Sequence, residues 1–523
     1  MKVPIRKISP ADLRRASQAL FLLLFLFLFL QTESKGGDEL GYPVRIFLDF
    51  DPLLSISSLL SSHALTTAFY LSLILVVVTI FLGRVFCGWI CPLGTLHNLV
   101  SSFRKEDTRV MASHWFRIKY YILIFILASS LFTLQLAGIM DPLSLLIRSL
   151  SLSIYPLFNY AIRAVFDTIY QWNPPVIVDL SETLYSLLKK SLLSFQQPYF
   201  HQGVFLGMLF LLVLGLNLIE KRFWCRFLCP LGALLGILSR YAFLKRSVSE
   251  GCTFCGACVP DCQGGALAKD GESWNGAECL YCMNCDDPCP VKAVSFGFGG
   301  KAAETSLDLG RRNIALSIAS GILTVPLLRI TPFTRLSDLN PQLIRPPGSL
   351  EEKEFLRRCI KCGECMKVCI TNGLQPTLLD AGLEGIWSPV LIPKIGYCEY
   401  RCILCGQVCP TGAIRKLTPE EKTRVRIGLA MIDPGRCLPY AHATPCIVCE
   451  EVCPTARKAI RLEQVKVKDR KGREVILKRP KIDLSLCIGC GICETRCPVS
   501  GQPAIYVTSA GESRSKDNQL LIV

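Results

Sequence analysis

Residues 279–290 read Cys-Leu-Tyr-Cys-Met-Asn-Cys-Asp-Asp-Pro-Cys-Pro, and this stretch sets the pattern for most of the chain. Its spacing is C-x2-C-x2-C-x3-C-P, the spacing with which thiolates bind [4Fe–4S] clusters. Residues 252–262 repeat the spacing, with Gln263 in place of the final proline. In such a pair, three close cysteines bind one cluster and the fourth reaches the neighbouring cluster. We therefore expect Cys289 to join Cys252, Cys255 and Cys258, and Cys262 to join Cys279, Cys282 and Cys285.

Four further groups follow in the C-terminal part of the chain, and all keep a C-x2-C-x3-C ending. The second opens with C-x3-C and the third with C-x8-C, while Ile370 replaces the proline after the first. The groups could pair in sequence or nest, first with fourth and second with third. They are Cys359, Cys362, Cys365, Cys369; Cys398, Cys402, Cys405, Cys409; Cys437, Cys446, Cys449, Cys453; and Cys487, Cys490, Cys493, Cys497.

So many cysteines could also bind zinc or form disulfides. Zinc sites use two separated C-x2-C pairs without a third spaced cysteine. Disulfides between cysteines three apart in a turn have poor geometry. The sixfold repetition therefore predicts six [4Fe–4S] clusters with 24 ligands.

A second repeat lies in the apolar N-terminal half. Residues 86–94, FCGWICPLG, match residues 224–232, WCRFLCPLG, and an Asp-Pro-Leu precedes each copy at Asp51 and Asp141. The paired cysteines Cys87, Cys91, Cys225 and Cys229 could bind one metal or cluster, act as redox dithiols, or be structural. They complete the chain's 28 cysteines.

Composition points to a membrane. Half of the 523 residues are hydrophobic, and the mean hydropathy is +0.38. Five apolar runs predict five transmembrane helices: 19–30, retained as an uncleaved first helix, 65–83, 120–139, 203–219 and 314–328. Lys and Arg concentrate before the first run and in loops 84–119 and 221–312, which predicts a cytoplasmic N-terminus and an outer C-terminal part. The segment Ser144–His201 reads as interfacial helices.

The formal charge of +16 does not indicate nucleic-acid binding. Six four-thiolate clusters at about −2 each would leave roughly +4. No C-x-x-C-H haem motif and no glycine-rich NAD or FAD fingerprint occurs. We therefore expect an electron-transfer protein, which could oxidise quinol, rather than a stand-alone enzyme.

With these motifs in view, the chain resembles two ferredoxin types joined in one. Residues 1–300 resemble the NapH type of membrane ferredoxin subunit, which NosR also resembles, through FCGWICPLG, FWCRFLCPLG and the paired cysteine groups. Residues 311–500 resemble the NapG/MauM type of periplasmic ferredoxin, through Arg311-Arg312 before an apolar segment, Ile344-Arg-Pro-Pro-Gly and four cysteine groups. The twin arginines suit export of a folded domain.

We expect an α-helical membrane bundle with two α+β ferredoxin domains. The expected parts are 1–245, membrane; 246–305, cytoplasmic two-cluster ferredoxin; 306–332, twin-arginine transmembrane segment; 333–350, linker; 351–508, periplasmic four-cluster ferredoxin; and 509–523, tail.

The resemblance implies electron transfer in a bacterial inner membrane, from quinol or a cytoplasmic donor to a periplasmic redox enzyme or cytochrome. Ser144–His201 is a candidate quinone site. Two alternatives stay open: a redox sensor or maturation factor for a partner metalloenzyme, and a cytoplasmic enzyme in which 314–328 does not cross.

Overall fold

The computed structural model describes residues 9–33, 40–64, 67–103, 113–172, 175–267, 273–299, 309–329, 340–468, 474–515 and 518. The residues outside these ranges include Lys2, Arg6 and Lys7 of the basic N-terminus, Lys35, linker residues 333–339 and, in the tail, residues 516, 517 and 519–523. The chain divides into two compact units. The first unit comprises Met1–Leu30, Val44–Ile147 and Phe205–Pro326, and the second comprises Gln31–Pro43, Arg148–Val204 and Leu327–Val523.

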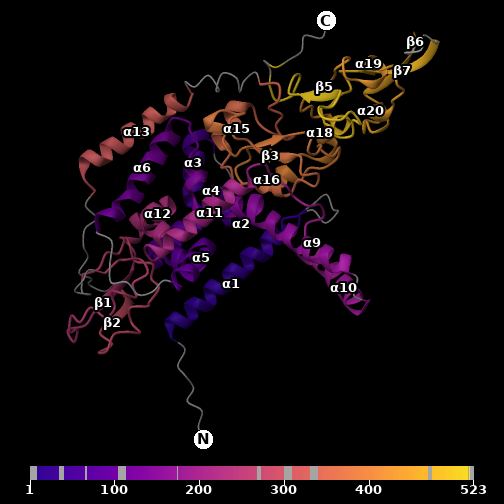
Figure 1. Ribbon diagram of the computed structural model, residues 1–523. Helices are drawn as coiled ribbons and strands as arrows, with labels where there is room; N and C mark the ends of the chain where they lie inside the picture. Colours follow the sequence, from indigo (N-terminus) through magenta and orange to yellow (C-terminus); the bar gives the residue numbers. More distant parts are fainter. Residues whose placement is uncertain are drawn as a thin grey trace. The chain divides into compact units, whose positions relative to one another are not determined.

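The first unit is mainly helical (Figure 1). Its helices tend to begin where a proline follows a capping residue: Asp51 caps α3 by accepting from the backbone N–H groups of Leu53 and Leu54. The elements are α1 (Pro10–Gln31), α2 (Ile46–Asp49), α3 (Pro52–Ser62), α4 (Thr67–Leu82), η1 (Phe86–Ile90), α5 (Pro92–Ser101), η2 (Ser113–Arg117), α6 (Ile118–Leu131), α7 (Ala137–Met140), α8 (Pro142–Ser149, ending in the second unit), α11 (Gly203–Gly215), η4 (Leu216–Leu218), η5 (Trp224–Leu228), α12 (Pro230–Ser239), β1 (Leu244–Val248), β2 (Val294–Phe298) and α13 (Arg311–Arg329).

The prediction of five transmembrane helices is wrong for the described residues. Two helical stretches are long and apolar enough to cross a membrane, Pro10–Gln31 and Pro142–Trp172. The runs predicted at 65–83, 120–139 and 203–219 form the shorter helices α4, α6 and α11, because each run bends or breaks before it reaches about 20 residues. The 19-residue α13 contains Pro326 and several polar residues, and it does not qualify.

The segment Ser144–His201 also differs from its prediction as interfacial helices. The α8 helix continues through η3 (Leu150–Ile154) into α9 (Tyr155–Trp172). Together they form one of the two candidate spans, 31 residues long. Pro156 lies inside this stretch, directly after the π-helical turn η3, in which the backbone N–H of Tyr155 bonds to the carbonyl of Leu150.

Several shorter helices of the first unit nevertheless expose apolar side chains. On α11, Leu211 is 60% exposed and Leu212 is 62% exposed, and on α4, Tyr70 is 63% exposed. So many exposed large apolar side chains are unusual on a protein surrounded by water. They form the surface that a lipid environment would cover.

The second unit contains the C-terminal cysteine groups and two long helices, α9 and α10 (Pro175–Ser191). Its strands form three two-stranded antiparallel pairs, β3–β4, β5–β8 and β6–β7. The remaining elements are α15 (Glu352–Arg358), α16 (Glu364–Lys367), β3 (Leu374–Pro376), η6 (Leu383–Gly385), β4 (Pro389–Leu391), α17 (Leu404–Gln407), α18 (Pro419–Arg424), β5 (Leu429–Ile432), α19 (Leu438–Ala441), α20 (Val448–Glu451), β6 (Ile460–Lys468), β7 (Glu474–Ile482), α21 (Ile492–Thr495) and β8 (Ile505–Thr508).

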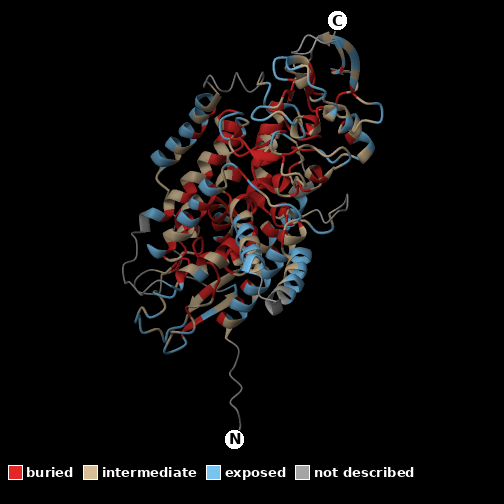
Figure 2. Cartoon of the chain, turned by 45° about the vertical axis from the view of Figure 1, so that its right-hand side comes forward, coloured by how far each residue is buried: buried red, intermediate tan, exposed pale blue. Residues whose placement is uncertain are grey.

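Buried residues are coloured red in Figure 2. In the second unit they include Phe355 and Val408, which are fully buried and line a pocket together with cysteines of the first two C-terminal groups. Arg148 is also buried: its Nη1 donates to the carbonyl of Lys361 at 3.0 Å, and its guanidinium lies 4.5 Å from the ring of Trp387. These contacts fix the last turn of α8 to the first C-terminal cysteine group.

Candidate metal centres

The first two C-terminal groups exchange their fourth cysteines. Cys359, Cys362 and Cys365 line one pocket together with Cys409 of the second group. Cys398, Cys402 and Cys405 line another together with Cys369 of the first group. Of the two pairings left open by the sequence, the structure therefore adopts pairing in sequence here.

The third and fourth groups are arranged in the same way. Cys437, Cys446 and Cys449 share a pocket with Cys497. Cys487, Cys490 and Cys493 share one with Cys453. The C-x8-C opening of the third group therefore still delivers its first cysteine to the same pocket as the other ligands.

The paired groups of the first unit also come together across the pair. Cys279 interacts electrostatically with Cys262 as well as with Cys282, and Cys258 interacts with both Cys252 and Cys289. The two quartets differ in exposure. Cys279, Cys282 and Cys285 are buried, whereas Cys255 is exposed.

The backbone around the second cysteine has a recurring shape. In four of the six groups, the residues on either side of that cysteine have positive φ angles, as at Lys361 (57°) and Gly363 (87°) around Cys362. Successive left-handed and right-handed residues point backbone N–H groups into one concavity, which favours an anion. The same pattern surrounds Cys255, Cys282 and Cys490.

The two groups with altered openings lack this shape. After the second cysteine, Ile403 has a φ of −122° and Ile447 a φ of −127°. A longer opening loop lets the first cysteine reach its pocket without the two left-handed residues. Isoleucine fits at these two positions because φ is negative there, whereas a β-branched residue strongly disfavours positive φ.

Burial holds most of these thiols in the neutral form until metal binds. It raises the pKa of Cys285 to about 12 and that of Cys449 to about 12. Iron binding requires thiolates, so loading such a site would release protons. The exposed Cys255 differs, because backbone and side-chain hydrogen bonds from Ala257 and Thr253 lower its pKa.

The internal repeat brings its four cysteines to one place, here called the four-cysteine chamber. Cys87, Cys91, Cys225 and Cys229 line a single pocket in the first unit. Each copy contains a one-turn π-helix, η1 or η5, followed by a proline-initiated α-helix. Cys91 and Cys229 cap those α-helices, with their sulfurs accepting from the N–H groups of Gly94 at 3.4 Å and Gly232 at 3.2 Å.

The chemistry and spacing of these donors fit clusters better than single ions. Among the described residues, no three His, Cys, Asp or Glu side chains lie close enough together to hold one metal ion. None of the 28 cysteines, all of them among the described residues, forms a disulfide. Soft thiolates spread around a cavity are the ligand set of an iron–sulfur cluster, which fills the space between them.

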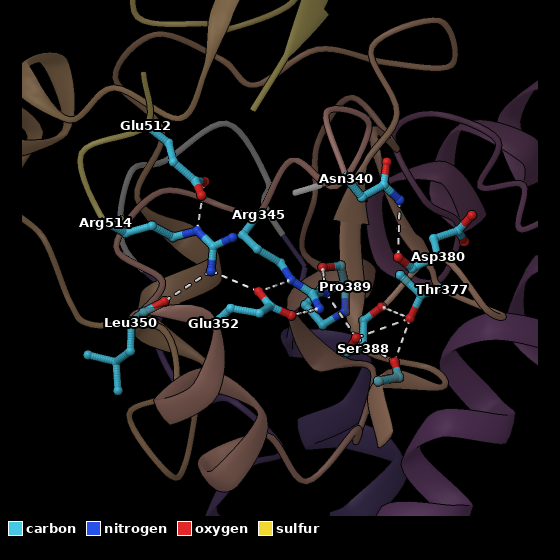
Figure 3. Close-up of polar contacts among 11 residues, drawn as sticks. Asn340, Arg345, Leu350, Glu352, Thr377, Asp380, Ser388, Pro389, Glu512 and Arg514 are labelled. Atoms are coloured by element: carbon cyan, nitrogen blue, oxygen red, sulfur yellow. Dashed lines mark hydrogen bonds and ion pairs between the residues drawn. The ribbon is translucent and has the colours of Figure 1, made fainter. Parts of the chain in front are cut away.

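Sequence reasoning missed the ionic network that holds the first C-terminal group in place. Arg345 donates to Glu352, Ser388 and the carbonyl of Pro389, and Arg514 from the end of the chain also pairs with Glu352 (Figure 3). Arg345 belongs to the Ile-Arg-Pro-Pro-Gly stretch, so the sequence singled out its position without showing its role. Its guanidinium also lies 4.6 Å from the ring of Phe355, in the helix that leads to Cys359.

Two family models match parts of the chain. A 4Fe-4S binding domain matches residues 65–110 and 200–249, and a 4Fe-4S dicluster domain matches residues 444–500. The first match contains the cysteines of the four-cysteine chamber and ends before Cys252. No solved structure matches the chain.

Curated relatives agree with these matches. The putative electron transport protein YccM of Escherichia coli is 25% identical over 267 residues, which cover 50% of this chain and 63% of YccM. The ferredoxin-type protein NapG of Escherichia coli is 35% identical over 97 residues, 18% of this chain and 41% of NapG. The regulatory protein NosR of Stutzerimonas stutzeri is 28% identical over 226 residues, 40% of this chain and 24% of NosR.

The chain thus spans less than two thirds of each of these relatives. The resemblance predicted from the motifs is confirmed by the two family models and by the relatives. The chain contains several 4Fe-4S ferredoxin-type segments and resembles the NosR/NapH-like membrane ferredoxins and the NapG/MauM-type ferredoxins joined in one chain.

Proposed function

We propose that this protein transfers electrons through six [4Fe–4S] clusters held by its 24 ferredoxin-type cysteines. The observation that carries the proposal is the exchange of fourth cysteines within each pair of groups, which brings four thiols to each C-terminal pocket. Paired clusters that share ligand loops lie near each other, which suits passage of single electrons. When bound, the clusters supply reversible one-electron redox chemistry.

The residues around each pocket set the conditions for that chemistry. Backbone N–H groups donate to cluster-facing sulfurs, as from Ala504 to Cys497 at 3.4 Å and from Ala293 to Cys289 at 3.3 Å. Such bonds stabilise the more negative, reduced state and raise the reduction potential. The pockets exclude water, since apolar residues such as Val408 and Ile414 line them beside the sulfurs.

The proposed route runs from the quinone pool or a cytoplasmic donor to a periplasmic redox enzyme or cytochrome. YccM is described as an electron transport protein and NapG as ferredoxin-type, which supports the class of function. The exposed apolar helices and two candidate spans support a place in the bacterial inner membrane. The twin arginines at the start of α13 support a periplasmic C-terminal domain.

Reduction of the clusters by quinol tests this proposal. The full-length protein, purified anaerobically in detergent, is mixed with a reduced quinol and frozen for EPR. We expect reduced [4Fe–4S] signals, and a protein that dithionite reduces but quinol does not would remove quinol as the donor. Reporter fusions placed after Arg329 test the orientation, since a reporter active only in the cytoplasm contradicts the periplasmic assignment.

A regulatory role is the second candidate, because the NosR relatives are described as regulatory proteins. In that case the clusters would report redox state to a partner metalloenzyme. A deletion strain that matures its metalloenzymes normally but lacks electron supply favours electron transfer. The reverse result favours regulation.

A further inference from the structure

The two copies of the internal repeat exchange arginines across the four-cysteine chamber. Arg84 precedes Cys87 by three residues, and Arg222 precedes Cys225 by three residues. Arg222 donates from Nη1 to the carbonyl of Cys87 at 3.0 Å, in the other copy. Arg84 likewise reaches the second copy, where a β-carbon at Gly232 would lie 2.9 Å from its Nη2. Each copy therefore contributes a guanidinium to the other copy's cysteine loop.

Both guanidiniums are buried and only partly satisfied. Arg84 and Arg222 are each 1% exposed, and Nε and Nη2 of both side chains have no hydrogen-bond partner. Buried charge is costly where its donors lack partners, so two guanidiniums with unpaired Nε and Nη2 groups beside one pocket favour an anion there. Arg84 also lines the chamber itself.

The neighbouring charges do not supply that anion. Glu278 lies 3.5 Å from Arg84, but its carboxylate also pairs with Lys119 and accepts from the hydroxyl of Tyr120 at 2.8 Å. The charges of Lys119 and Glu278 therefore cancel each other. The other nearby carboxylate, Glu220, is paired with Arg226. Two positive charges remain beside the chamber, and a [4Fe–4S] cluster with four thiolates carries about −2.

The chamber also touches one ferredoxin quartet directly. Gly88 and Trp89 lie between Cys87 and Cys91, while Leu280 and Tyr281 lie between Cys279 and Cys282. Trp89 donates from Nε1 to the carbonyl of Tyr281 at 2.9 Å. A β-carbon at Gly88 would lie 2.2 Å from the carbonyl oxygen of Leu280, so only glycine permits this approach. Arg226 adds a bond from Nη2 to the carbonyl of Cys262 at 2.7 Å.

We propose that the four-cysteine chamber binds a seventh cluster, a [4Fe–4S] centre balanced by Arg84 and Arg222, which exchanges single electrons with the cluster of Cys262, Cys279, Cys282 and Cys285. The inference rests on the proposed function. One cluster loses the electron that the other gains, and no bond forms or breaks. The order of centres in the first unit is then the chamber, the buried quartet, and the exposed quartet of Cys252, Cys255, Cys258 and Cys289.

Iron analysis of the full-length protein tests the cluster. With six ferredoxin clusters and the chamber loaded, the wild type holds about 28 irons, and the Cys87→Ser/Cys225→Ser variant is expected to hold about 24. Retention of the other six clusters shows that the variant is folded. An iron content in the variant equal to that of the wild type would overturn the seventh cluster. So would a wild type that holds about 24 irons and whose chamber cysteines are oxidised in pairs. Either result would leave the six-cluster proposal standing.

Substitution of Arg222 tests the charge balance. Arg222→Met removes one positive charge beside the cluster and is expected to lower the midpoint potential of the chamber's EPR signal, because the reduced state is the more negative one. Arg222→Lys keeps the charge and should restore most of the potential. Equal potentials in Arg222→Met and wild type would contradict the assignment of this arginine.

Gly88→Ala tests the contact between the two loops. The added methyl must move the loops apart, so we expect weaker spin–spin coupling between the two reduced clusters at unchanged iron content. Gly215→Ala is the matched control, because nothing lies within 4 Å of a β-carbon there. Coupling that survives Gly88→Ala unchanged would refute the electron exchange. Iron-free wild-type protein, by contrast, would refute the proposed function itself.

Discussion

Arg345 and Glu352 form a buried two-point ion pair in the second unit, with Nε 3.0 Å from Oε2 and Nη2 2.6 Å from Oε1. Their side chains are 0% and 9% exposed. Arg514 binds the same carboxylate at 2.8 Å, so residues near the end of the chain are tied to the helix before Cys359. Glu352 therefore pairs with both arginines, and Arg514 pairs with Glu512 as well (Figure 3).

Glu352→Gln should destabilise the full-length protein strongly. The change leaves the buried Arg345 without a counter-charge and leaves Arg514 with Glu512 alone. Breaking a buried ion pair in this way costs about 3–5 kcal/mol. Thermal unfolding of wild type and variant in the same detergent measures the effect. Glu463→Gln is the control, because its ion pair with Lys481 is exposed at 50% and 65% and should contribute under about 1 kcal/mol. Equal effects of the two variants would show that the buried network is not stabilising.

The contribution of Glu352 should also depend on pH. Burial alone raises the pKa of this carboxyl, but Arg345 and Arg514 outweigh burial and hold the pKa below its usual 4.5. A depressed folded-state pKa gives stability that is present above the unfolded value and is lost as pH falls through the folded one. The gap in unfolding midpoint between wild type and Glu352→Gln should therefore be constant near neutral pH and narrow only below about 4.5. A gap that narrows above pH 6 would contradict this assignment.

Pairs of cysteine variants test the exchange of fourth ligands. Cys359 and Cys409 line one pocket, whereas Cys398 lines the next. Cys359→Ser/Cys409→Ser should lose about four irons, no more than either single variant, because both residues serve one cluster. Cys398→Ser/Cys409→Ser should lose about eight. The opposite pattern would mean that each group keeps its own fourth cysteine.

Gly489→Ala should disturb the fourth C-terminal group far more than Gly412→Ala. Both glycines have positive φ, 73° and 67°, so each variant carries a left-handed penalty of about 1–2 kcal/mol. A β-carbon at Gly489 would also lie within 2.4–2.6 Å of the backbone of Gly428, whereas Gly412 has nothing within 4 Å. Unfolding midpoints and iron content of the two variants measure the difference. Equal losses would show that the close approach to Gly428 is unimportant.

Iron should leave the two quartets of the first unit in a fixed order. Cys255 is exposed, whereas Cys279, Cys282 and Cys285 are buried. A water-soluble iron chelator added after mild oxidation should therefore remove the cluster of the exposed quartet first. EPR of samples taken over time measures the order of loss. A Cys255→Ser variant, which lacks a ligand of the exposed quartet, identifies the signal that should disappear first. Simultaneous loss would mean that exposure does not control access.

The cysteine spacing alone was enough to predict the ferredoxin character of this chain. A thiolate ligand set is encoded locally, because in four of the six groups the first three cysteines lie within seven residues and can wrap one side of a cluster whatever the rest of the fold does. The internal repeat was equally visible, and the structure shows why it recurs: both copies form a π-helical turn followed by a proline-initiated helix.

The number of membrane spans could not be predicted in this way. Hydropathy reports the apolar length of a run, but α6 and α11 end where the backbone turns, before the run itself ends. Conversely, Arg148 and Arg163 made Pro142–Trp172 look too polar to be continuous. Arg148 is satisfied within the second unit by Lys361 and Trp387, a compensation that is invisible in sequence.

The sequence by itself determined which residues could hold clusters, because the ligands of each group are close neighbours along the chain. Only the tertiary structure decided how the groups combine. It chose pairing in sequence in the C-terminal domain and placed Gly88 against Leu280. These contacts join residues far apart in the chain. They depend on packing and on the pairing of buried charges, which no local pattern records.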